Sequence, residues 1–305
     1  MPQSIQSAVH LLLQTQKQEW PLAQKNFQAL HDVEERILSC GSVKVRVQHN
    51  PARAISSGAK VDAKSIAERP CFLCAHNRPQ EQRAIVWNAF EILINPFPIF
   101  HNHLTIPLRE HQPQQLLPHL GSMMLLAAEL PDFTIFYNGA RCGASAPDHM
   151  HFQAGNTEEF PVIADFLEMR PSLEQRLLEN GGVHLYCMSE QHYLRTVWVL
   201  EGNDTALLLS AFRTLFPTIE QEEPLMNVLC NRSGITTRLY IFPRQSFRPW
   251  QYNAEGNERL MVSPATVELA GIIITPRKED YEKITMSDVQ SIYQQITWHE
   301  DPQIR

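Results

Sequence analysis

Hydrophobic residues recur with two different periods along the first half of the chain. Apolar side chains at helical spacing in residues 4–38, interrupted at Pro21, predict two amphipathic helices that pack on the main body. Residues 42–47 alternate like a strand, and residues 133–138 predict another. Residues 114–130 predict a helix ahead of that second strand. The first half therefore combines strands with a packed helix.

The second half repeats this order in degenerate form. Residues 204–216 predict a helix, and a turn at Asn231-Arg232-Ser233-Gly234 separates two of the predicted strands. The four predicted strands of this half are residues 183–188, 195–200, 226–230 and 239–242. A duplicated core is the natural interpretation. Beyond it, residues 270–276 predict a buried strand, and residues 287–296 predict a helix with Ser287 as its N-cap.

The most informative alternation lies in residues 149–153, HMHFQ. Apolar and polar side chains alternate there as in a strand with one buried face, so two imidazoles and one amide share the other face. A neutral imidazole is a competent nucleophile near neutral pH, and its attack on phosphorus splits a difficult displacement into two easier ones. The amide of Gln153 is neither acid nor base, but it can donate a hydrogen bond to a phosphate oxygen.

A loop rich in small residues precedes this strand. Gly139, Gly143 and Ala144 supply backbone that can approach a phosphate closely, and Ser145 adds a hydroxyl. For an isolated His-x-His, a half-buried strand with ordinary polar histidines is the simpler interpretation. The glycine-rich loop before the strand and Gln153 together favour nucleotidyl transfer through a histidine.

Cys71 and Cys74 have the Cys-x2-Cys spacing that binds zinc through two thiolates about 2.3 Å from the metal. The sequence contains no second pair of this kind, so a tetrahedral site needs histidines as well. A redox pair and two ordinary buried thiols are the competing interpretations. A redox pair is typical of a thioredoxin-like strand-to-helix turn, which the surrounding pattern does not predict.

Composition limits the possible functions. The chain has 305 residues, of which 43% are hydrophobic, so it can bury a sizeable core. A net charge of −7 offers no basic field for long nucleic acid. The sequence shows neither a membrane span nor a signal peptide, and its six irregularly spaced cysteines are typical of reduced thiols. We therefore expect a cytoplasmic protein that binds no membrane.

Residues from about 70 to 155 resemble the transferase branch of the histidine-triad superfamily, which includes galactose-1-phosphate uridylyltransferase, diadenosine tetraphosphate phosphorylase and GDP-hexose phosphorylase. The motif His-x-His-x-Gln implies that His151 becomes nucleotidylated and that Gln153 assists it. The hydrolase branch would carry a third histidine in place of Gln153. The resemblance also implies catalytic and phosphate contacts for Ser145, and nucleotide contacts for Asn138 and Gly143.

A second match starts at Glu91, where the sequence EILINPFP resembles a strand and turn that border a nucleoside pocket. It implies contacts from Asn95 and Phe97 to ribose and base; for Phe97, core packing is an equal alternative. The next strand, residues 103–107, resembles the strand that carries a histidine and ends in proline.

The uridylyltransferase resemblance implies structural zinc held by Cys71, Cys74, His149 and a histidine of that next strand. Counting forward from Asn95 places this histidine at His103. Counting back from Pro107 instead reaches Asn102, so the spacing departs from the family pattern.

The resemblance implies an α+β fold of two fused histidine-triad-like lobes, with antiparallel sheets and packed helices. We divide the chain into an N-terminal extension (1–48), a catalytic lobe (49–165) and a degenerate second lobe (166–305). The second lobe has RLYIF at 238–242 where the first has HMHFQ, and should be catalytically silent. This lobe also carries three cations that either contact a phosphate or are ordinary solvated charges: Arg244, Arg248 and Lys278.

The resulting hypothesis is a ping-pong nucleotidyltransferase or phosphorylase that acts through a covalent nucleotidyl-His151. Its substrates would be a nucleotide sugar or dinucleoside polyphosphate and a phosphate or phosphosugar acceptor, and the resemblance suggests a homodimer. Two alternatives stay open: a nucleotide hydrolase of histidine-triad type, and a nucleotide-sensing protein without turnover.

Overall fold

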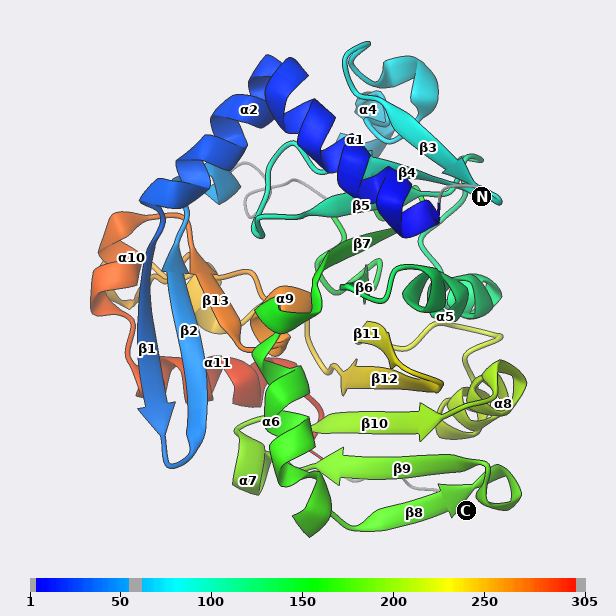
Figure 1. The fold of residues 1–305 in the computed structure, drawn as a ribbon. Coiled ribbons are helices and arrows are strands. Elements are labelled where there is room, and N and C mark those ends of the chain that lie inside the picture. Colours follow the sequence, from blue (N-terminus) through cyan, green and yellow to red (C-terminus); the bar gives the residue numbers. More distant parts are fainter. Residues whose placement is uncertain (1–3, 55–61, 300–305) are drawn as a thin grey trace.

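The computed structural model describes residues 4–54 and 62–299. Within them, ten strands form one antiparallel sheet, which runs from top to bottom of Figure 1. The strands are β3 (Ala84–Trp87), β4 (Phe90–Ile94), β5 (Leu104–Pro107), β6 (Phe133–Asn138), β7 (His151–Asn156), β8 (Gln175–Leu178), β9 (Val183–Met188), β10 (Val197–Gly202), β11 (Met226–Ser233) and β12 (Thr236–Pro243).

The sheet consists of two halves with the same connectivity. Their spatial order is β3-β4-β5-β7-β6 followed by β11-β12-β10-β9-β8, so in each half the fifth strand lies between the third and the fourth. A helix joins the third strand to the fourth in both halves, α5 (Leu120–Glu129) in the first and α8 (Thr205–Leu215) in the second. The halves meet where β6 pairs with β11, with Asn138 opposite Asn227. The predicted α+β fold of two fused lobes is confirmed.

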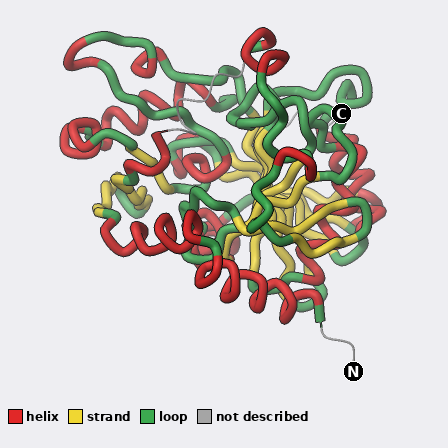
Figure 2. The backbone as a smooth tube through the Cα atoms, turned by 90° about the horizontal axis from the view of Figure 1, so that it is seen from above, coloured by secondary structure: helices red, strands yellow, loops and turns green. Residues whose placement is uncertain are grey.

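Each face of this sheet has its own hydrophobic core, and helices lie on both sides of the strands (Figure 2). One face packs against α1 (Ile5–Glu19), α2 (Pro21–Gln28), α5 and α8. The other packs against α6 (Pro161–Met169), α9 (Thr266–Leu269) and α11 (Met286–Ile296). Phe152 on β7 belongs to the first core, so the alternation of the strand turns His151 and Gln153 toward the second face.

A small second sheet joins the two ends of the chain. It contains β1 (Glu34–Cys40), β2 (Val43–His49) and β13 (Ile272–Thr275), in which β13 runs parallel to β2. The short helices α4 (Ala63–Glu68), α7 (Glu190–Tyr193) and α10 (Lys278–Lys283) complete the described elements with several 3-10 turns. Among the described residues, no helix combines the length and apolar character needed to cross a membrane. The domain boundaries at residues 48 and 165 stay predictions.

Three local predictions need correction. Helix does not extend to residue 38, because residues 34–40 form β1, which pairs along its whole length with β2. The outer strands β3 and β8 were not predicted; both are short. Thr285 rather than Ser287 caps α11: its hydroxyl accepts the Asp288 N–H at 3.2 Å, and the Asp288 carboxylate accepts the Thr285 N–H at 2.8 Å.

Candidate active site

A cavity of about 570 Å³ opens between the first half of the sheet and the C-terminal segment. Its walls come from β4, β6 and β7, the loop before β7, and the residues around α9. The predicted catalytic and nucleotide-binding residues all line it: Asn95, Phe97, Asn138, Gly143, Ser145, His151 and Gln153. The structure thus brings together side chains that lie far apart in the sequence.

His151, at the start of β7, has one ring nitrogen engaged and one left for the cavity. Its Nδ1 lies 2.8 Å from the backbone oxygen of His149, so Nδ1–H donates and the lone pair belongs to Nε2. Burial lowers the pKa of His151 to about 4, which keeps the ring neutral near pH 7. The side chain of Gln114 holds this strand end, since it accepts the His151 N–H at 2.8 Å and donates to the His151 carbonyl at 3.0 Å.

The loop that precedes β7 requires glycine at position 143. Gly143 has φ +102°, and a Cβ there would lie 2.5 Å from the Cβ of Ala265. The next turn of this loop is tied by Arg69, which donates to the Ser145 carbonyl at 3.0 Å and pairs with Asp148 at 3.2 Å. The loop therefore has a defined shape beside the nucleophile.

The structure corrects the predicted metal set. His103 is fully buried immediately before β5, where its Nε2 lies 3.0 Å from the amide oxygen of Gln153 and its Nδ1 accepts the Ile99 N–H at 3.1 Å. Both ring nitrogens are thus engaged away from the cysteines. The histidine that joins Cys71 and Cys74 is His111 instead.

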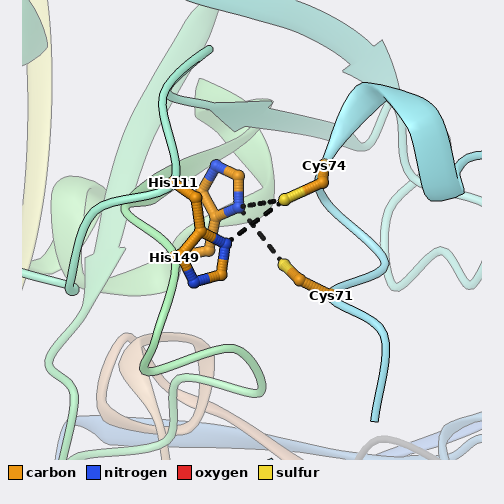
Figure 3. Close-up of side chains that lie close together, drawn as sticks. All are labelled: Cys71, Cys74, His111 and His149. Atoms are coloured by element: carbon orange, nitrogen blue, oxygen red, sulfur yellow. Dashed lines mark hydrogen bonds between the residues drawn. The ribbon is translucent and has the colours of Figure 1, made fainter.

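Cys71, Cys74, His111 and His149 face one another, with their ligand atoms all within 4.8 Å (Figure 3). The sulfur of Cys71 lies 3.2 Å from Nδ1 of His149, and that of Cys74 lies 3.2 Å from Nδ1 of His111. The His149 Nε2–H donates to the Leu108 carbonyl at 2.7 Å, so in the neutral ring Nδ1 is unprotonated and directed at the thiols.

His149 connects this group to the nucleophile. Its ring faces the two cysteines, while its backbone carbonyl accepts the hydrogen bond from the His151 ring. Contrary to prediction, His149 lies in the turn before β7 and not in the strand itself. Holding the His149 ring therefore also fixes the carbonyl that orients His151.

Three arginines line the cavity: Arg53, Arg69 and Arg248. Arg53 donates to the Phe97 carbonyl at 2.8 Å, and burial lowers its pKa to about 10, so it stays charged near pH 7. One carboxylate, Glu268, lines the same cavity. Sequence reasoning missed three of these residues: Arg53 and Glu268 lie in no motif, and Arg69 precedes the Cys-x2-Cys pair without being part of its spacing.

The other two predicted cations of the second lobe lie elsewhere. Arg244 is buried and bonds to Asn227 and to several backbone carbonyls, so it supports the fold. Lys278 pairs with Glu34 at the surface.

Comparison with known proteins finds matches for both halves of the chain. Residues 12–156 match a domain family described as of unknown function, DUF4922, and residues 167–303 match the GDPGP1-like C-terminal domain. Over 199 residues the chain is 27% identical to GDP-L-galactose phosphorylase 2 of Arabidopsis thaliana; the match covers 63% of this chain and 44% of the plant protein. The yeast Ap4A phosphorylase Apa2 has the same fold: its complexes with Ap4A and with AMP give TM-scores of 0.59 and 0.57 at 16% identity, covering 94% and 96% of this chain and 98% of each of those.

The predicted resemblance to the transferase branch of the histidine-triad superfamily is confirmed. Within the described residues, the first half of the sheet faces the cavity that contains His151, the histidine nucleophile candidate. The matching face of the second half is filled by Tyr186 and Tyr240, whose rings pack edge-on against Phe166 of α6.

Proposed function

We propose that the protein is a nucleotidyltransferase or phosphorylase that forms a covalent nucleotidyl intermediate on His151. The observation that carries this proposal is the hydrogen bond from His151 Nδ1–H to the His149 carbonyl. It leaves Nε2 as the nucleophilic nitrogen in a cavity lined by arginines and amides, which suit a phosphate ester.

The reaction balances in two displacements. In the first, the Nε2 lone pair attacks the α-phosphorus of the donor, a P–N bond forms, and the P–O bond to the leaving phosphate or phosphosugar breaks. In the second, an oxygen of the acceptor phosphate attacks the same phosphorus and the P–N bond breaks, which returns His151 to its neutral form. The His149 carbonyl stabilises the positive charge that develops on the ring.

Two donor classes follow from the relatives. The plant relative is named a GDP-L-galactose phosphorylase and the yeast structures are of an Ap4A phosphorylase, so a nucleotide sugar and a dinucleoside polyphosphate are the donors to test. Gln153 favours transfer over hydrolysis, because its amide cannot activate water as a base. Product analysis with and without phosphate separates a phosphorylase from a hydrolase. Saturable nucleotide binding without adduct or turnover would indicate a sensing protein.

We also propose that Cys71, Cys74, His111 and His149 hold structural zinc. Zinc bonds of about 2.3 Å to sulfur and 2.0 Å to nitrogen, at the tetrahedral angle, set sulfur and nitrogen about 3.5 Å apart. The three shortest sulfur to Nδ1 separations here are 3.2, 3.2 and 3.5 Å, so the donor set fits. The metal would close four protein ligands around itself and anchor the turn that orients His151. A homodimer and a cytoplasmic location stay predictions.

Intact-protein mass spectrometry tests the proposed intermediate. The protein is incubated briefly with GDP-, ADP- and UDP-sugars and with diadenosine tetraphosphate, and then denatured. We expect a mass gain of one nucleoside monophosphate, which is lost in His151→Ala and kept in the control His184→Ala on β9. A His151→Ala protein with full turnover contradicts the proposal.

A further inference from the structure

The amide of Gln153 is held from behind by two donors. Its Oε1 lies 3.0 Å from Nε2 of His103 and 3.4 Å from Nδ2 of Asn95. Gln153 and Asn95 line the cavity, whereas His103 is completely buried behind them. The two neighbours therefore decide which end of the Gln153 amide faces a bound phosphate, according to whether their nearest atoms donate or accept a hydrogen bond.

The backbone decides the tautomer of His103. The Ile99 N–H points at Nδ1 from 3.1 Å, and a backbone N–H can only donate, so Nδ1 has no proton. Burial, followed by the positive charge of Arg53, lowers the pKa of His103 to about 3, so the ring is neutral. Its single N–H is then on Nε2 and points at Gln153.

A second backbone group decides the orientation of Asn95. The Phe97 N–H donates to Oδ1 of Asn95 at 2.9 Å, so the amide nitrogen of Asn95 is the end that faces Gln153. Two donors with fixed hydrogens thus converge on one end of the Gln153 side chain. That end must be the acceptor oxygen, and the opposite end, turned to the cavity, is the NH₂ group.

We propose that His103 is a positioning residue of the phosphate site: it holds Gln153 so that its amide N–H groups, and never its oxygen, meet the phosphate. This inference rests on the proposed function and adds to it a residue that touches no substrate. A reversed amide would set a carbonyl oxygen against the phosphate oxygens and remove a donor from the transition state.

Asn138, on the neighbouring strand β6, shows the same arrangement independently. Its Oδ1 accepts the backbone N–H of Thr266 at 3.0 Å and lies 3.3 Å from Nδ2 of Asn227. With its oxygen occupied, Asn138 also turns its NH₂ group to the cavity that it lines. Both carboxamides next to His151 therefore present donors alone, which matches an anionic phosphate.

A pair of substitutions tests the role of His103. The amide nitrogen of glutamine reproduces the position of Nε2, and the amide oxygen of asparagine reproduces that of Nδ1. His103→Gln keeps the donor to Gln153, whereas His103→Asn keeps only the acceptor for Ile99. We expect the rate of adduct formation to fall on the order of 10²-fold in His103→Asn, the loss typical of one removed transition-state donor.

His103→Gln should restore most of that rate, with KM for the donor little changed in either variant. A purely structural role predicts equal losses in the two variants, and equal rates in His103→Asn and the wild type overturn the proposal outright.

Nuclear magnetic resonance of the wild-type protein tests which nitrogen of His103 carries the proton, even if the variants fold poorly or the enzyme forms no adduct. In histidine-labelled protein, we expect His103 as the Nε2–H tautomer; the Nδ1–H tautomer overturns the inference. In glutamine-labelled protein with inorganic phosphate, the Gln153 side-chain amide should shift in His103→Asn and return in His103→Gln. Absence of any adduct in the wild type would instead count against the proposed function alone.

Discussion

The two halves of the sheet share one strand order but differ in what covers them. Beside His151 and Gln153 of β7, the sheet face borders a cavity with three arginines. Strand β12 occupies the same place in the second half, and there Tyr240 packs against α6. Topology alone therefore does not make a site; the chemistry follows from the side chains of one strand face and from the segment laid over it.

The second half nevertheless completes the site of the first. Ala265 packs against Gly143, and Thr266 and Asn227 hold the Asn138 amide. The second half therefore supports the site that lies on the first half of the sheet.

The largest expected contrast is between His151→Ala and Tyr240→Ala. Loss of the nucleophile should abolish adduct formation and leave a folded protein. Truncation of the buried tyrosine should instead lower the free energy of unfolding by about 3–5 kcal/mol, because it leaves a cavity in the core. Chemical denaturation and adduct mass spectrometry measure the two effects. If the two variants lost activity equally and were equally stable, the proposed difference between the two halves would be wrong.

Metal removal is the next largest effect. Cys74→Ser removes one of the four proposed zinc ligands. If the proposed site holds zinc, this substitution should weaken zinc binding by more than about 100-fold, the upper range for loss of a residue that merely supports a ligand. Adduct formation should slow with it, because the His149 carbonyl orients His151. Elemental analysis measures the bound zinc, and the adduct assay measures the rate of adduct formation. Cys187→Ser is the control. Full activity in a zinc-free protein would show that the turn needs no metal.

A smaller effect is expected at the loop of the first half. Gly143→Ala places a Cβ against Ala265 in addition to the strain of a positive φ, so it should displace the loop and slow adduct formation. Its matched control is Gly234→Ala, at φ +60° in the turn between β11 and β12, where a Cβ meets nothing within 4 Å. That control should lower the free energy of unfolding by about 1 kcal/mol and leave the activity unchanged. Similar activity in both variants argues against close packing at the loop.

The smallest effect concerns the hydroxyl of Tyr240, which is buried without a hydrogen-bond partner within the described part of the chain. Tyr240→Phe should leave activity unchanged and keep or slightly raise the melting temperature, since it removes an unsatisfied polar group. A clear loss of stability in a thermal melt would reveal a role for this hydroxyl.

The sequence predicted the parts of the site that lie in short motifs. His151 and Gln153 are recognisable because alternation is a local property, and Asn138 because the family resemblance covers a short segment. The structure places all three in one cavity. His111 was missed because it lies in a loop, where no periodic pattern fixes its direction. Arg53 and Glu268 meet only through tertiary contacts.

The same reasoning explains the errors in the fold. Strand β1 depends on its pairing with β2, and its sequence alone has a pattern compatible with a helix. The duplicated core was predictable because each half repeats the order of strands and helix, whereas the pairing of β6 with β11 is a contact that no local pattern encodes.

The most direct test of the central claim is to locate the adduct. After incubation with the donor that gives the largest mass gain, the protein is quenched, digested and sequenced by tandem mass spectrometry. We predict a nucleoside monophosphate on the peptide around residues 149–153, with the modified side chain at His151. A nucleotide attached elsewhere, or phosphate-dependent turnover with no modified peptide in rapidly quenched samples, would contradict the account.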